Sequence, residues 1–243
     1  MSKKPWKNEL VLLFLGAQFL CFSIAILTAN VLHKFQMNGF RHEDDFGILL
    51  LATLGFQGVT WILIPIFLRL NGVAMGDAFG LHASNLFRSI GLAFATLIVV
   101  LPVALLLELL SGAIMEKFGF ESKPEAAVEL INGAPLWPTG MYLGFFAVLL
   151  APVAEEFIFR GVLFPFIKQL GYPKFAWLGV SSLFAFIHGN VTVFIPLFVF
   201  ALALTWLYEK TDNLLAPIVA HSLFNAANLI GLLYLDHSLP APT

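Results

Sequence analysis

The sequence predicts an all-α fold, a polytopic bundle of seven to eight transmembrane helices. Of its 243 residues, 59% are apolar and only 12% are charged, whereas about 25% are charged in a typical soluble domain. The mean hydropathy is +0.89. The apolar residues form runs of about 20, the length that crosses roughly 30 Å of hydrocarbon as a helix. A chain with so few charges cannot cover a water-facing surface, which excludes an ordinary cytosolic enzyme.

Three charge-free runs in the first half, 10–32, 47–68 and 89–107, predict the first three spans. Pro102 predicts a kink in the third. The basic residues before the first run resemble the start of a signal peptide. However, the 23 residues of this run exceed the usual apolar region of about 7 to 15 residues. We therefore expect an uncleaved membrane anchor.

A mixed stretch, 111–138, separates these spans from the rest. Within it Ser122, Pro124 and Glu125 have the pattern of a helix start with a capping box and an early proline. Apolar residues then line one side of this segment. The sequence predicts an amphipathic connecting helix on the bilayer surface, with a substrate gate as the alternative.

The second half contains four further apolar runs, 139–169, 175–187, 191–208 and 213–235, and a turn is expected at 171–173. Seven crossings with an inside N-terminus put nine basic residues on the inner side and four on the outer side, which favours a cytoplasmic N-terminus. The inner set is Lys3, Lys4, Lys7, Arg69, Arg88, Arg160, Lys168, Lys174 and Lys210, and the outer set is Lys34, Arg41, Lys117 and Lys123.

Five ionisable residues stand out within or directly beside these apolar runs, and such residues are costly in hydrocarbon unless they are paired or face a wet cavity. They are Glu155, Glu156, Arg160, His188 and His221. Because residues four apart share a helix face, we expect Glu156 and Arg160 to form a structural ion pair. Glu155 is turned about 100° away from Glu156 around the helix axis, so its carboxylate is not used in this ion pair.

Chain bends predict the depth of the remaining polar residues. About a bend at position 171.5, Glu155 and His188 are each 16.5 residues away, or roughly 25 Å along their helices. A second bend near Thr211 puts Asn225 roughly 21 Å along the last helix, with His221 one turn nearer the bend. We expect these four side chains to share one site. The alternative is that each only bonds between helices.

The chemistry of this set fits hydrolysis by an activated water. A carboxylate such as Glu155 in a low-dielectric cavity suits a general base, and His188 could hold the same water. His221 and the Asn225 amide could stabilise the resulting oxyanion. Glu155, His188 and His221 are also a possible zinc set, so the residue types leave open whether the cofactor is zinc or none. A net charge of -2 argues against nucleic acid as a partner.

Three motifs at compatible spacing make the chain resemble a known family. Residues 155–160 match EExxxR, residues 184–188 match FxxxH, and residues 221–225 match HxxxN. In this order they resemble the CPBP family of intramembrane proteases. That family includes the CAAX prenyl endopeptidase and bacterial members linked to bacteriocin immunity or peptide-signal processing. The resemblance covers about the last 100 residues.

The resemblance implies an α-helical membrane endopeptidase with a catalytic core at 139–243, preceded by N-terminal helices and the connecting segment at 1–138, all in one membrane domain. The resemblance implies that Glu155 and His188 activate water. It also implies that His221 and Asn225 form the oxyanion site. The family has been described both as metalloproteases and as glutamate proteases, so the zinc alternative stays open. We expect a membrane-associated protein or peptide as substrate, and a bacterial plasma membrane as the location.

Two other classes of function stay open at this stage. A non-catalytic membrane protein, such as an immunity factor, could bind a peptide or partner protein through the same cavity. A small proton-coupled transporter could use Glu155 as its proton site. The separated motifs and the lack of an inverted repeat in the sequence argue against the transporter.

Overall fold

A computed structural model describes residues 4, 6–35, 46–82, 86–119 and 144–235. In these ranges the regular structure is helical, without strands, which confirms the predicted all-α bundle. The expected connecting helix at 122–131 and the boundary between 138 and 139 lie outside the described residues, so both stay predictions.

The first half contains the three predicted spans. The second is one continuous helical run with a π-helical turn in its middle, where Gly55 approaches the first helix so closely that a Cβ atom would lie 2.3 Å from that of Ala25. The third helix continues through Pro102. The elements are α1 (Asn8–Lys34), α2 (Phe46–Thr53), η1 (Leu54–Gly58), α3 (Val59–Asn71), a short α4 (Met75–Phe79) and α5 (Leu86–Lys117).

The second half begins with a helical run, η4 to α9, that changes three times between π and α geometry. Gly171, with φ 92°, makes the predicted turn after it, and Pro173 begins the next helix. The elements are η4 (Phe146–Leu150), α8 (Ala151–Glu156), η5 (Phe157–Leu163), α9 (Phe164–Gln169), α10 (Pro173–Ile187), α11 (Val191–Thr211) and α12 (Leu215–Leu235).

Five of the seven expected crossings are long and apolar enough to span a membrane by themselves: α1, Leu50–Asn71, α5, α11 and Leu215–Leu232. The protein is therefore an integral membrane protein. α10 has 15 residues, or about 22 Å, which is shorter than the roughly 30 Å of hydrocarbon. The run from η4 to α9 contains Glu155, Glu156 and Arg160, but residues 156–162 are all buried within the protein. Neighbouring helices, rather than lipid, surround these charges.

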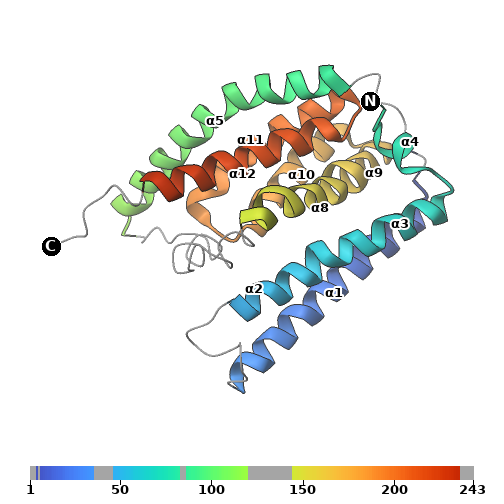
Figure 1. Cartoon of the computed structure of the whole chain (residues 1–243), viewed down its shortest axis with the longest axis horizontal. Coiled ribbons are helices and arrows are strands. Elements are labelled where there is room, and N and C mark those ends of the chain that lie inside the picture. Colours follow the sequence, from blue (N-terminus) through green and yellow to red (C-terminus); the bar gives the residue numbers. More distant parts are fainter. Residues whose placement is uncertain (1–3, 5, 36–45, 83–85, 120–143, 236–243) are drawn as a thin grey trace.

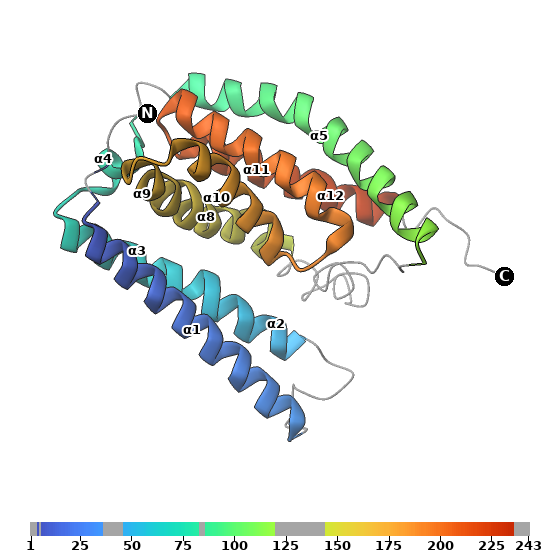
Figure 2. The ribbon, with the colours of Figure 1, turned by 180° about the vertical axis from the view of Figure 1, so that it is seen from behind.

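Figures 1 and 2 show the helices in three layers. α5 covers α11 and α12 on one side, the run α8–α9 lies with α10 in the middle, and the hairpin α1–α3 lies on the other side. The hairpin diverges from the middle layer away from α4. Aromatic rings of α3 and α4 meet the middle layer at Phe157 in η5: Trp61 lies 6.3 Å and Phe79 4.8 Å from it between ring centroids. Helix directions alternate, so α1 begins at one end of the bundle and α12 ends at the other.

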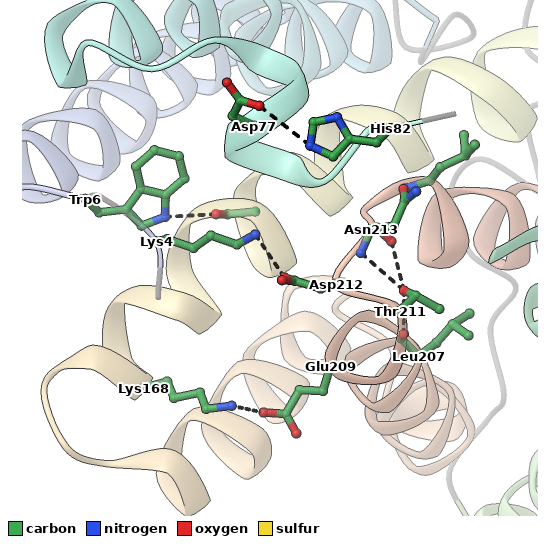
Figure 3. Close-up of polar contacts among 12 residues, drawn as sticks. Lys4, Trp6, Asp77, His82, Lys168, Leu207, Glu209, Thr211, Asp212 and Asn213 are labelled. Carbon is green, nitrogen blue, oxygen red and sulfur yellow. Dashed lines mark hydrogen bonds and ion pairs between the residues drawn. The ribbon is translucent and has the colours of Figure 1, made fainter. Parts of the chain in front are cut away.

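Polar contacts close the end of the bundle at which α1 begins, as Figure 3 shows. Lys4 Nζ lies 3.0 Å from Asp212 Oδ1, which follows α11, and Lys168 is paired with Glu209. The backbone N–H of Leu214 donates to the carbonyl of Phe79. We call this the polar end. It joins α4, the N-terminal segment and the α11–α12 turn.

Replacing Gly80 with Ala is expected to destabilise the polar end severely. Gly80 has φ +68°, and a Cβ atom there would lie 1.8 Å from the carbonyl oxygen of Asp212. Gly72 is a matched control, because its φ is +69° but nothing lies within 4 Å of its Cβ position. We expect Gly72→Ala to lower the free energy of unfolding by about 1 to 2 kcal/mol, and Gly80→Ala by clearly more. Denaturant unfolding in detergent micelles measures this, and equal losses would contradict the close contact.

Candidate active site

Glu155 and Glu156 end α8, immediately before the π-helical segment η5. A π turn widens the helix and changes which carbonyls find a partner inside it, and such turns recur at functional sites. Arg160 lies within η5. The local backbone therefore places two adjacent carboxylates and one guanidinium on a helix that is irregular at this point.

Glu156 is the buried centre of the cluster, with a side chain that is 0% exposed. Its Oε1 accepts from Arg160 Nη1 at 2.8 Å and from His221 Nδ1 at 2.9 Å. The ion pair expected from the i,i+4 spacing is thus present. The contact with His221 was not foreseen from the sequence, where His221 was expected only among the residues around Glu155.

Arg160 joins this helix to two others. Its Nη2 donates to the carbonyl of Ala201 in α11 at 3.0 Å, and its guanidinium lies 4.8 Å from the ring centroid of Phe184 in α10. A buried charge is tolerated where an opposite charge and hydrogen bonds replace water. Glu156 supplies the charge, and the backbone of α11 supplies an acceptor.

His221 lies between the two carboxylates. Its ring packs edge-on against Phe184 and Phe200, with centroids 5.5 and 5.4 Å away. A carboxylate accepts hydrogen bonds, so Nδ1 carries the proton that binds Glu156. Nε2 lies 3.9 Å from Glu155 Oε2, an ion-pair distance too long for a hydrogen bond. His221 therefore connects the compensated carboxylate with the second one.

Glu155 differs from Glu156 in its surroundings. Its side chain is 13% exposed and its ion pair is the distant one with His221. No guanidinium or ammonium group among the described residues pairs with it. Two identical side chains next to each other thus have different environments: one is sealed and charge-compensated, and the other is partly exposed.

His188 directly follows α10, and its Nδ1 donates to the carbonyl of Phe184 at 2.7 Å, which leaves Nε2 of the neutral ring as an acceptor. In the described part of the chain, Glu155 is paired with His221 and not with His188. The predicted antiparallel register nevertheless holds. Phe159 and Phe184 are symmetric about position 171.5, as Glu155 and His188 are, and their rings pack 5.3 Å apart.

Asn225 lies one turn beyond His221 on α12. Its Nδ2 donates to the carbonyl of Ala147 in η4 at 2.8 Å, so one amide hydrogen is used and the other remains. Phe200 and Phe224 stack with centroids 4.0 Å apart. They are symmetric about position 212, close to the bend that the sequence predicted at Thr211.

The sequence did not indicate the aromatic enclosure of His221 or the backbone acceptor at Ala201. Phe184 had a signal, because it is the first residue of FxxxH, but Phe200 and Ala201 belong to a run without any polar pattern. For the zinc alternative, the described residues contain no group of three His, Cys, Asp or Glu side chains at metal-ligand spacing. Glu155, His188 and His221 thus do not form a ready metal site in this structure.

Comparison with known proteins identifies relatives of this chain. Residues 137–227, which contain every residue of the candidate site, match the family described as type II CAAX prenyl endopeptidase Rce1-like. The UPF0177 protein YaiF of Lactococcus lactis subsp. lactis (strain IL1403) is 24% identical over 218 residues, covering 88% of this chain and 94% of YaiF. The UPF0177 protein YxdF of the same strain is 31% identical over 84 residues, covering 34% of this chain and 44% of YxdF. No solved structure matches.

Replacing Arg160 with Met is expected to lower the free energy of unfolding by about 3 to 5 kcal/mol, because it leaves the Glu156 carboxylate buried without its guanidinium. The double variant Glu156→Gln with Arg160→Met should lose less, since no uncompensated charge remains. Arg69→Met, at an exposed position near the end of α3, is the control and should change stability by less than about 0.5 kcal/mol. Unfolding in detergent micelles tests this. A double variant no more stable than Arg160→Met would contradict the charge argument.

Proposed function

We propose that this chain is an intramembrane endopeptidase, because residues 137–227 match the family described as type II CAAX prenyl endopeptidase Rce1-like. Its substrate is a membrane-associated protein or peptide, and the reaction is hydrolysis of a peptide bond by an activated water. The difference between the two adjacent carboxylates supports this proposal most directly. Glu156 is sealed and paired with Arg160, whereas Glu155 is partly exposed and, among the described residues, has only the distant His221 as an ion-pair partner.

In the proposed reaction Glu155 is the general base. It takes a proton from a water molecule while the water oxygen attacks the peptide carbonyl. His188 helps to hold this water: its Nδ1–H is used by the carbonyl of Phe184, so Nε2 accepts a hydrogen bond from the water. The proton on Glu155 then passes to the leaving amine as the C–N bond breaks. No covalent acyl-enzyme forms.

The oxyanion of the tetrahedral intermediate needs hydrogen-bond donors, and His221 and Asn225 are the proposed ones. Asn225 has one amide hydrogen left beyond its bond to Ala147. His221 donates from Nε2 only when both ring nitrogens carry a proton, since Nδ1–H already binds Glu156. Glu156 and Arg160 support the site by holding His221.

We propose that this hydrolysis proceeds without a metal. The spacing of Glu155, His188 and His221 does not form a ready three-ligand site, so no step is assigned to zinc. The proposed location is a bacterial plasma membrane with the polar end and the N-terminus in the cytoplasm. Basic residues retained on the cytoplasmic side and relatives in Lactococcus lactis support it. Nucleic acid is not a proposed partner.

Glu155→Gln and His188→Ala are expected to lower the cleavage rate at least about 100-fold, the contribution typical of a positioned acid or base. Both variants should insert into the membrane and purify like the wild type. Glu108→Gln, which changes an exposed carboxylate on α5, is the matched control and should cleave normally. Cleavage of a membrane-peptide library by the purified protein measures these rates. Full activity of either site variant would refute the assignment, and a wild type without turnover would favour a binding protein.

Chelator treatment tests the metal-free mechanism. The purified protein should cleave its peptide at an unchanged rate after incubation with a strong chelator, because Glu155 acts on water directly. Loss of activity that added zinc restores would reject the metal-free mechanism and support the zinc alternative.

A further inference from the structure

Trp6, which precedes α1, contacts the helix that contains the candidate site. The side chain is 5% exposed, and its indole Nε1–H donates to the carbonyl of Gly161 at 3.1 Å. Gly161 follows Arg160 directly in η5. A residue 155 positions away in the sequence thus supplies a hydrogen bond next to the buried ion pair.

The sequence that follows Gly161 removes the α-helical donor to its carbonyl. In an α-helix it would accept from the amide of residue 165, but that residue is Pro165, which has no amide hydrogen and whose ring crowds this carbonyl. In a membrane protein a buried carbonyl cannot rely on water. The indole of Trp6 donates to this carbonyl from outside the helix.

The surroundings fix this indole in place. Its ring lies 4.9 Å from that of Phe67 and 5.9 Å from that of Phe79. A Cβ atom on Gly161 would lie 2.8 Å from Phe79, so glycine is what allows the close approach. On either side of Trp6, Lys4 is paired with Asp212, and the backbone N–H of Lys7 donates to Asn71 Oδ1 at 3.0 Å.

The path from Trp6 to the site is short. The backbone of η5 positions Arg160, and Arg160 binds the same Glu156 oxygen that holds His221. If the carbonyl of Gly161 lost its external donor, the π segment would gain freedom beside Arg160. The change would reach His221 through Glu156, and among the described residues His221 is the imidazole paired with Glu155.

We propose that Trp6 is a positioning residue: its indole N–H holds the carbonyl of Gly161 and keeps η5 in the geometry that sets Arg160 and Glu156 around His221. The effect on turnover rests on the proposed peptidase function. The effect on η5 does not, because it concerns the helix itself.

The test compares Trp6→Phe with Trp177→Phe in the full-length protein. Trp177 also donates its indole N–H at the polar end, to Glu209 Oε2 at 2.9 Å, but not to η5. We expect Trp6→Phe to lower kcat about fivefold to tenfold, as for the loss of one buried hydrogen bond, with KM nearly unchanged. Hydrogen exchange of peptides from 157–169 should become about fivefold faster. Trp177→Phe should leave both quantities within twofold of the wild type.

Testing Trp6→Phe in a second variant, Pro165→Ala, separates the effect of this hydrogen bond from the effect of lost packing. Pro165→Ala gives residue 165 an amide hydrogen that can bind the carbonyl of Gly161, which makes the indole donor dispensable. In this background Trp6→Phe should change kcat and exchange by less than twofold. A purely structural role of Trp6 would give the same loss in both backgrounds, because the lost packing area is the same.

Two results would overturn the proposal: equal effects of Trp6→Phe in the two backgrounds, or exchange in 157–169 that Trp6→Phe leaves unchanged. If the wild type cleaves no peptide while Glu155→Gln behaves identically, the peptidase function fails. The exchange measurements then still decide the role of Trp6.

Discussion

The buried ion pair of Glu156 and Arg160 is the interaction on which the second half of the structure depends. Two charges can stay inside a membrane bundle only if they compensate each other and find further hydrogen bonds. Here α10 contributes the ring of Phe184, α11 the carbonyl of Ala201, and α12 the imidazole of His221. These contacts therefore fix the depth and the rotation of each neighbouring helix relative to α8. The position of the partly exposed Glu155 follows from the same contacts.

The π segments impose a second constraint. Each of the three that the structure describes has a carbonyl that accepts from the side chain of another element. Gln18 donates to Phe56 in η1, Asn225 to Ala147 in η4, and Trp6 to Gly161 in η5. In the absence of water, carbonyls displaced by a widened turn need such donors. These bonds also fasten helices that are distant in sequence, so local irregularity becomes tertiary structure. Asn225 therefore joins α12 to η4, in addition to its proposed role in the reaction.

The spans and the helical register could be predicted because both depend on local rules. Charge-free runs are long enough to cross hydrocarbon, and the turn at 171–173 sets the antiparallel alignment that the Phe159–Phe184 contact displays. The spacing of Glu156 and Arg160 predicted their pair. The number of helices that are long and apolar enough to span the membrane by themselves was less predictable. α10 is shorter than a span, and the run through η5 is shielded by other helices, a property that length and composition do not report.

By itself, the sequence determined the all-helical membrane fold, the antiparallel register about position 171.5 and the family motifs, because each follows from composition or from spacing along the chain. Only the tertiary structure decided which imidazole meets which carboxylate. Residue spacing orders side chains along an axis, but the rotation of α12 against α8 depends on packing across the bundle. That rotation puts His221 between Glu155 and Glu156, and leaves His188 bonded to its own helix.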